Sequence, residues 1–262
     1  MSTSPTEKLL LDICEHTAVI TINNPPANTW DAESLIGLRQ IVSELNVNRD
    51  IYALVITGSG DKFFSAGADL KMFASGDKAV AQDIGLKFGQ AFEALADFRG
   101  VSIAAVNGFA MGGGLECAMA CDIRIVERQA KLALPEAKVG LLPCAGGTQR
   151  LTALVGPGWA KRMILCGERI DAETAQRIGL AEEVVDSGEA KSAAMNLAAS
   201  VAAQSPVAVS FCKELIHEAR DAVMPKGLIL ERERFIQLFD TADQKEGVNA
   251  FLEKRQPEWK NA

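Results

Sequence analysis

Short β-branched runs alternate along this chain with longer segments of helical period, and this alternation restricts the possible folds more than any other feature. Between the first two runs, a breaker cluster at 23–28 predicts a loop, and apolar residues three or four apart predict a helix from about Ala32 to Leu45. The strand-like runs are Thr17–Ile22, Tyr52–Thr57, Ile103–Val106 and Asp122–Val126. The pattern predicts an α/β protein.

The last quarter of the chain has a different pattern. No strand-like run of any length follows Gly188, and Ser205-Pro206 predicts a helix cap with proline at the first helical position. We expect helix from there to Phe251, packed on its own body or on a neighbouring subunit. Neither a repeat period nor a flexible linker separates the parts, so two independently folding domains are not predicted.

Composition and charge exclude several classes of protein. With 262 residues, 48% of them hydrophobic, the chain can form a sizeable core. A net charge of −7 disfavours binding to nucleic-acid phosphates. Six cysteines without a Cys-x-x-Cys pair and two histidines offer too few ligands for zinc, so we expect no metal and reduced, mostly buried thiols.

Neither end of the chain nor its most apolar stretch indicates a membrane protein. The N-terminus lacks the pattern of a signal or transit peptide, which predicts a cytoplasmic protein. The apolar stretch 101–121 is interrupted by Asn107, Glu116 and four glycines. A buried strand, turn and helix therefore fit it better than a membrane span.

Two turns rich in small residues follow predicted strands. Gly112, Gly113 and Gly114 stand where a strand should become a helix, so their N–H groups can approach a ligand closely. The segment 65–68, Ser-Ala-Gly-Ala, follows the strand that ends near Thr57, and alone it fits a tight connection without a ligand equally well. Together the turns can aim two N–H donors at one point, as in an oxyanion hole. Phosphate-loop and dinucleotide motifs are absent from the sequence.

Two carboxylates accompany the glycine-rich turn. Glu116 and Glu136 are 20 residues apart, and a glutamate in an apolar stretch must be solvated, paired or functional. Glu136 follows Pro135, and it could instead be a helix-start carboxylate. His16 and His217 have no Ser or Cys partner at motif spacing, which favours structural roles for both.

Three segments, 64–71, 103–122 and 135–150, strongly resemble the enoyl-CoA hydratase/isomerase (crotonase) family, and the resemblance runs from about Ala18 to Pro257. It implies an α/β fold with a spiral core of repeated β-β-α turns over residues 1–200. It also implies a helical C-terminal region over 201–262 that builds homotrimers and commonly homohexamers, as dimers of trimers. The implied substrate is a coenzyme A thioester, and we expect no metal or redox cofactor.

The resemblance also assigns roles to residues. The N–H groups of Ala68 and Gly113 become oxyanion donors, and Glu116 and Glu136 become the two catalytic carboxylates. Substrate-binding residues carried over in the same way are Ala66, Asp69, Leu70, Lys62, Lys71 and Lys254, with the first two lysines near the pantetheine and phosphate end and the last near the ribose phosphate. The chain departs from the family pattern at Asn24 and Pro26, where basic residues are common, and at Cys144, where glycine is common.

The pair of glutamates favours one reaction within the family. Two carboxylates can hold one water molecule against an alkene, and two N–H donors can polarise the thioester carbonyl. We therefore expect an enoyl-CoA hydratase that forms 3-hydroxyacyl-CoA reversibly. The alternatives are a double-bond isomerase, a hydratase specialised for a branched, aromatic or sulfur-containing acyl chain, and, from another class, an RNA-binding family member. The sequence does not determine acyl specificity or pathway.

Overall fold

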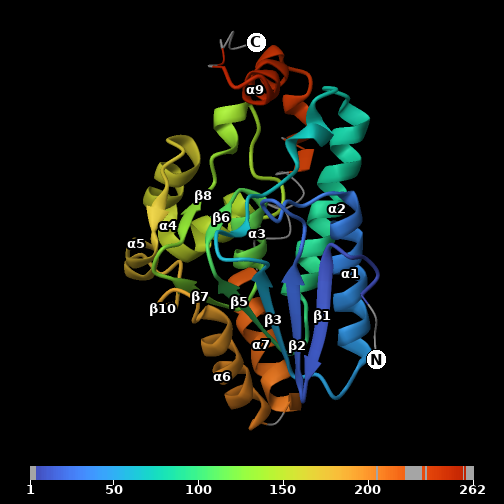
Figure 1. The fold of residues 1–262 in the computed structure, drawn as a ribbon, viewed down its shortest axis with the longest axis vertical. Coiled ribbons are helices and arrows are strands. Elements are labelled where there is room, and N and C mark those ends of the chain that lie inside the picture. The colour runs from blue at the N-terminus through green and yellow to red at the C-terminus, as the bar shows by residue number, and fades with distance from the viewer. Residues whose placement is uncertain (1–3, 205, 222–231, 234, 256, 258–262) are drawn as a thin grey trace.

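Two β-sheets form the centre of the computed structural model, which describes residues 4–204, 206–221, 232–233, 235–255 and 257 (Figure 1). The larger sheet has the strand order β1-β2-β3-β5-β7-β10. β1 pairs with β2 antiparallel, and every other neighbouring pair is parallel. Its strands are β1 (Leu9–Cys14), β2 (Thr17–Ile22), β3 (Ala53–Gly58), β5 (Val101–Val106), β7 (Ile123–Glu127) and β10 (Glu183–Val185).

Both faces of this sheet are buried, because alternate residues of its central strands enter two different clusters. Val19, Val55 and Ile103 pack with three alanines of α6 (Ala190–Ala202) that are spaced four residues apart. The intervening side chains enter the main core, which also receives the apolar faces of α1 (Ala32–Val47) and α2 (Lys78–Ala96). The continuous apolar runs of the sequence are therefore strands buried on both sides.

A smaller sheet, with the order β4-β6-β8-β9, is built from much shorter strands. The pairs β4/β6 and β6/β8 are parallel, and β8/β9 is antiparallel. The strands are β4 (Phe63–Ser65), β6 (Phe109–Met111), β8 (Lys131–Ala133) and β9 (Ile170–Asp171). A strand of the larger sheet, a strand of the smaller sheet and a helix follow one another three times: β3, β4, α2; β5, β6, α3 (Gly113–Ala120); and β7, β8, α4 (Gly147–Leu165). The predicted α/β class is confirmed.

The sequence located four strands of the larger sheet (β2, β3, β5 and β7) and α1, but it missed β1 and the short strands. The predicted helix is α1, whose N-cap Asp31 accepts from the Ser34 N–H at 3.0 Å. The stretch 101–121 is β5, β6 and α3, as expected for a buried strand, turn and helix, and no described helix is long and apolar enough to cross a membrane. The strands β4, β6, β8 and β9 have two or three residues each, too few to show a period of two.

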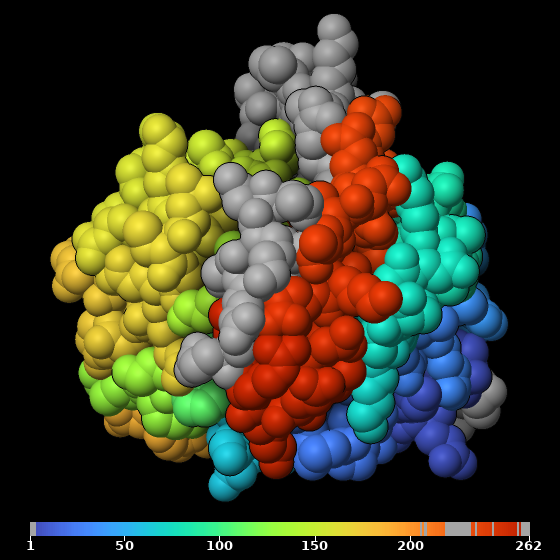
Figure 2. Space-filling model, turned by 90° about the horizontal axis from the view of Figure 1, so that it is seen from above, coloured from blue at the N-terminus to red at the C-terminus, as the bar shows by residue number. Residues whose placement is uncertain are grey.

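The C-terminal helices lie at opposite ends of the molecule. Figure 1 shows α7 (Pro206–Asp221) at the end near α6, and α9 (Ala242–Leu252) at the other end. Pro206 begins α7 as predicted, whereas its proposed cap Ser205 and residues 222–231 lie outside the described residues. α9 packs on two 3₁₀ turns, η1 (Leu70–Phe73) and η2 (Glu136–Val139). Figure 2 shows the described C-terminal residues, in red, lying between α4 and α2. The remaining helix is α5 (Ala172–Arg177).

A half-buried ion pair fixes α7 to the body of the protein. The Lys213 ammonium donates to the Asp122 carboxylate at 2.7 Å and to the carbonyls of Phe98 and Gly100 at 2.6 and 3.0 Å. Burial by itself would raise the pKa of the Asp122 carboxyl, but hydrogen bonds from His217 and Lys213 and the Lys213 charge outweigh it, so the pKa lies below its usual value. Asp122 is therefore held as a carboxylate under α7.

We predict that Lys213→Met lowers the free energy of unfolding by about 3 kcal/mol at pH 7, because it leaves a largely buried carboxylate without its cation. The folded-state pKa of Asp122 lies below 3.8, so its stabilising contribution is present above about pH 4 and is lost as the pH falls through the folded value. Urea unfolding at several pH values measures both effects. Lys78→Met, which breaks the exposed pair of Lys78 with Asp240, is the control and should cost less than about 1 kcal/mol. Equal losses in the two variants would contradict the prediction.

Candidate active site

The pairing of the short strands brings three turns to one place. β4, β6 and β8 run parallel with Ser65 opposite Ala110 and Met111 opposite Ala133, so their carboxyl ends coincide at one edge of the smaller sheet. The chain leaves these ends through segments 66–69, 112–113 and 134–136. Each segment contains predicted site residues, and this edge is therefore the candidate active site.

Hydrogen bonds hold the connection after β3 and the first of these turns in place. The Asn107 side chain, after β5, accepts from the Gly58 N–H at 3.0 Å and donates to the carbonyls of Gly58 and Gly60. Trp30 forms an isolated parallel bridge with Ala68, in which the Trp30 N–H donates to the Gly67 carbonyl and the Asp69 N–H donates to the Trp30 carbonyl. This bridge uses the Gly67 carbonyl and the Asp69 N–H, and not the Ala68 N–H.

The predicted oxyanion donors lie next to each other. A Cβ placed on Gly67 would be 3.1 Å from the amide nitrogen of Gly113, and a Cβ placed on Gly113 would be 3.7 Å from the amide nitrogen of Ala68. Gly113 is the first residue of α3, where backbone N–H groups have no partner within the helix. Gly112 turns the chain into this helix with φ of +53°, a conformation that favours glycine. Ala68 and Gly113 therefore lie close together at this edge of the sheet.

Glu116 lies one turn into α3 and is 2% exposed. Its Oε1 accepts from the N–H groups of Ala145 and Gly147 at 2.8 and 2.9 Å. A buried carboxylate needs such donors, because an unsolvated charge in an apolar interior is very unfavourable. The turn 145–147 therefore allows an acidic side chain to persist inside the core.

Glu136 begins η2 and lies against the glycine turn at residues 112–113. A Cβ placed on Gly112 would be 3.0 Å from the Glu136 Oε1 atom, so this carboxylate lies against the backbone next to Gly113. The Glu136 carbonyl accepts from the Leu141 N–H, which closes the 3₁₀ turn. The two glutamates come from different elements of the fold, α3 and η2.

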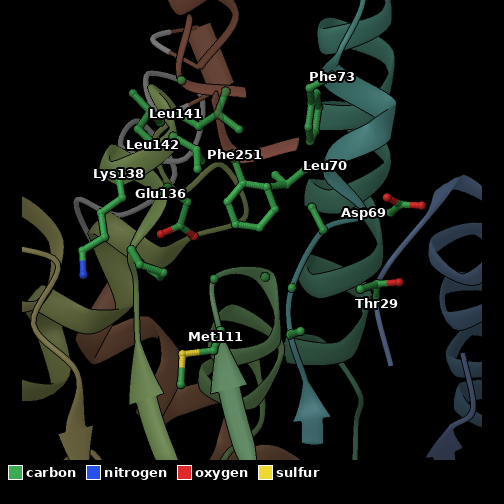
Figure 3. Close-up of a pocket in the computed structure, with 18 of the residues that line it drawn as sticks. Thr29, Asp69, Leu70, Phe73, Met111, Glu136, Lys138, Leu141, Leu142 and Phe251 are labelled. Carbon is green, nitrogen blue, oxygen red and sulfur yellow. The ribbon is translucent and has the colours of Figure 1, made fainter. Parts of the chain in front are cut away.

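A cavity of about 650 Å³ joins these groups (Figure 3). The predicted residues that line it are Ala66, Ala68, Asp69, Leu70, Lys71, Gly113, Glu116 and Glu136. Its wall includes apolar residues of η2, the loop after it and α9, namely Val139, Leu141, Leu142, Phe251 and Leu252. Figure 3 shows the Phe251 ring between Leu70 and Glu136. Amide donors, two carboxylates and an apolar wall can together bind a carbonyl compound and move protons on it.

Two predicted lysines are not among the lining residues. The Lys62 ammonium lies 5.4 Å from the centre of the Phe63 ring, and Lys254 is exposed just after α9. Sequence reasoning missed three cations that do line the cavity: Lys138, Arg169 and Arg255. Lys138 stands two residues after Glu136 and could have been found by that proximity. Arg169 and Arg255 come from distant segments, and no local pattern indicates them.

Asn24 and the cysteines complete the comparison with the sequence. Asn24, one of the departures from the family pattern, donates to the carbonyl of Thr29, a lining residue. Cys144 also lines the cavity and is buried with Cys117 and Cys121, whereas Cys14, Cys166 and Cys212 are exposed. The expectation of mostly buried thiols is therefore correct for half of them. Burial raises the pKa of the Cys121 thiol to about 12, which makes it unreactive near neutral pH.

Comparison with known proteins agrees with this geometry. The chain belongs to the enoyl-CoA hydratase/isomerase family, whose sequence model matches residues 12–262. It is 38% identical to the short-chain-enoyl-CoA hydratase of Clostridium acetobutylicum over 92% of this chain and 93% of that protein. It is also 38% identical to the crotonyl-CoA hydratase of Syntrophomonas wolfei over 95% of this chain and 96% of that protein.

Solved structures give the same result for the fold. The structure of DspI from Pseudomonas aeruginosa is 69% identical in sequence, with a TM-score of 0.82 and 97% of each chain covered. The enoyl-CoA hydratase of Bacillus anthracis is 34% identical, with a TM-score of 0.80 over 98% of this chain and all of that one. The crotonase-like fold implied by the sequence resemblance is confirmed.

Proposed function

We propose that this protein is an enoyl-CoA hydratase that adds water reversibly across the 2,3-double bond of a 2-enoyl-CoA. Family membership and the similarity to two named hydratases support this activity. The single observation that carries the proposal is that Glu116 and Glu136 line one cavity together with Ala68 and Gly113. The acyl-CoA thioester is thus the substrate, and coenzyme A is part of it.

In the proposed reaction, the N–H groups of Ala68 and Gly113 bind the thioester oxygen. This draws electron density from the conjugated double bond, so that carbon 3 becomes electrophilic and negative charge develops on the oxygen. Each such donor contributes roughly 3 kcal/mol to lowering the barrier. The donors belong to rigid turns, so little reorganisation is needed as the charge develops.

The carboxylates supply the two proton transfers. Two N–H groups donate to Glu116, which favours its ionised form, so we assign Glu116 to the removal of a proton from water. Glu136 lies across the glycine turn and, as the neutral carboxylic acid, is assigned to proton delivery at carbon 2. Proton exchange with solvent then returns Glu116 to the carboxylate and Glu136 to the acid. Each acid–base role is worth on the order of 10² to 10⁴ in rate. Hydration transfers no electrons to an acceptor, and independence from metal and redox cofactors stays a prediction.

We predict that Glu116→Gln and Glu136→Gln each lower kcat for hydration of crotonyl-CoA by about 100-fold or more, while the midpoint of thermal unfolding changes little. The amide keeps the shape of the side chain but cannot exchange a proton. Loss of the conjugated thioester absorbance measures the rate, and mass spectrometry of the product identifies 3-hydroxybutyryl-CoA. Wild-type kinetics in both variants would refute the assigned roles. A shifted double bond without added water would indicate the isomerase alternative.

The polar end of the substrate should meet cations at the cavity. Lys71 lines it near the oxyanion turn, so we propose that Lys71 contacts coenzyme A. We propose that Ala66, Asp69 and Leu70 also contact the substrate, because they line the same cavity. The Asp69 carboxylate also accepts from the Lys71 N–H at 3.1 Å and so caps η1. Lys62 and Lys254 remain candidates for the phosphates because the resemblance assigns them.

We predict that Lys71→Met raises KM for crotonyl-CoA about 3- to 5-fold with little change in kcat, as expected for loss of one solvent-accessible ion pair. The N-acetylcysteamine thioester of crotonic acid, which lacks the phosphates, is the matched control substrate and should show no such increase. Lys62→Met and Lys254→Met should have smaller effects, because neither lysine lines the cavity. An equal increase of KM with the truncated thioester would contradict a phosphate contact.

We further propose that the protein forms homotrimers or homohexamers. α7 exposes Phe211, Leu215 and Ile216 with exposed fractions of 61, 64 and 67%. Phe211 and Leu215 are one helical turn apart on the same face, and Ile216 adjoins Leu215. Large apolar side chains exposed together on one helix usually mark an interface. We also propose a cytoplasmic location, because the exposed free thiols of Cys14, Cys166 and Cys212 suit a reducing compartment.

We predict that Leu215→Glu converts the oligomer into smaller species, because it places a charge in the proposed apolar contact. Sedimentation velocity of the wild type and the variant measures the change. Glu214→Gln, on the exposed residue next to it, is the matched control and should leave the assembly unchanged. A wild-type protein that sediments as a monomer would refute the proposal.

A further inference from the structure

The carboxylate of Glu116 is held by a backbone turn whose shape depends on glycine. Gly146 has φ of +98°, a left-handed conformation, and it lies between the two residues whose N–H groups donate to Glu116. A Cβ on Gly147 would lie 2.8 Å from the Glu116 Oε1 atom. The turn therefore lets two amides converge on a single oxygen, and its own shape must be fixed by something else.

Arg150 contacts this turn from the other side. Its Nη1 donates to the carbonyl of Ala145 at 2.8 Å, and its backbone N–H donates to the carbonyl of Gly146 at 2.7 Å. A Cβ on Gly146 would lie 2.3 Å from the same Nη1 atom, so the guanidinium occupies the space that the missing side chain provides. Arg150 is 5% exposed and lies in the first turn of α4.

The charge of Arg150 also reaches the helix that carries Glu116. Burial raises the pKa of the Cys117 thiol well above its usual value, and the nearby Arg150 charge opposes that rise. Burial raises the pKa of Cys121 as well, and Arg150 is one of the cations that oppose it. Cys117 follows Glu116 directly in α3, so the Arg150 charge acts on the helix that carries Glu116.

We propose that Arg150 is a positioning residue for the hydration reaction: it fixes the turn 145–147 so that the Ala145 and Gly147 amides hold the Glu116 carboxylate ionised and oriented toward the substrate. Hydrogen bonds hold Ala145 at both of its backbone polar groups, because its carbonyl accepts from Arg150 and its N–H donates to Glu116. A rotation of this residue would move the donor away from the carboxylate. Arg150 is not among the lining residues of the cavity, so it acts through the turn. This inference rests on the proposed hydratase function.

The test compares Arg150→Met with Arg150→Lys, measuring kcat and KM for crotonyl-CoA and the pH dependence of kcat. We expect Arg150→Met to lower kcat about 10- to 100-fold, the scale of a small misplacement of a catalytic group, with KM changed less than about 3-fold. The acid limb of the kcat profile should move to higher pH, because fewer hydrogen bonds then favour the ionised form of Glu116. Arg150→Lys keeps the charge and a donor, and it should recover part of kcat.

Arg124→Met is the matched control. Arg124 is 3% exposed and donates to the carbonyls of Leu180 and Cys121 at 2.7 and 2.9 Å, but it does not touch the turn. This variant should lower the midpoint of thermal unfolding without moving the acid limb. A purely structural role for Arg150 would make the two methionine variants alike, with activity lost in proportion to folding and unchanged acid limbs, and that result would overturn the proposal.

A second readout does not depend on catalysis. The pH at which the Glu116 carboxyl carbon titrates can be followed by ¹³C NMR, with Glu116→Gln to assign the signal, and it should rise in Arg150→Met. An unchanged titration would overturn the positioning role even if the wild type hydrates crotonyl-CoA. If the wild type hydrates no enoyl-CoA, the hydratase proposal fails and the NMR titration still decides the role of Arg150. Should Arg150→Met not fold, Arg150→Gln, which removes the charge but keeps a polar side chain, takes its place in both measurements.

Discussion

The site depends on the parallel pairing of three very short strands. β4, β6 and β8 contribute three residues each, and their common direction makes three separate turns leave the smaller sheet at one edge. Ala68, Gly113 and Glu136 come together for this reason, although up to 68 residues separate them in the chain. The larger sheet supplies the rigidity, because helices and core cover both of its faces.

Burial and function are linked most closely at Glu116. The carboxylate lies inside an otherwise apolar helix, where an unsolvated charge would be strongly destabilising. Two amide donors on one oxygen offset that penalty and orient the group at the same time. Gly146 and Gly147 allow those donors to approach the carboxylate closely. The same contacts thus serve stability and the proposed catalysis, so a loss of activity at this turn has to be compared with a matched loss of stability elsewhere.

The C-terminal region completes the cavity of its own chain. α9 packs on η1, which follows segment 66–69, and on η2, which contains Glu136. It contributes Phe251 and Leu252 to the wall of the cavity. Gly247 permits this close contact, because a Cβ there would lie 2.3 Å from the carbonyl carbon of Val139. The walls of the proposed acyl site therefore come from segments more than 100 residues apart. Acyl specificity cannot be read from any one of these segments.

The sequence by itself determined the α/β class, the strands β2, β3, β5 and β7, and α1, because periodicity and capping are local properties. It also indicated the glycine turns and both glutamates, since a carboxylate in an apolar run stands out against its neighbours. Only the tertiary structure decided that these groups share one cavity, that Lys138, Arg169 and Arg255 line it while Lys62 and Lys254 do not, and that Arg150 supports the turn under Glu116. Those facts depend on strand register and on contacts between distant segments, which leave no periodic pattern in the chain.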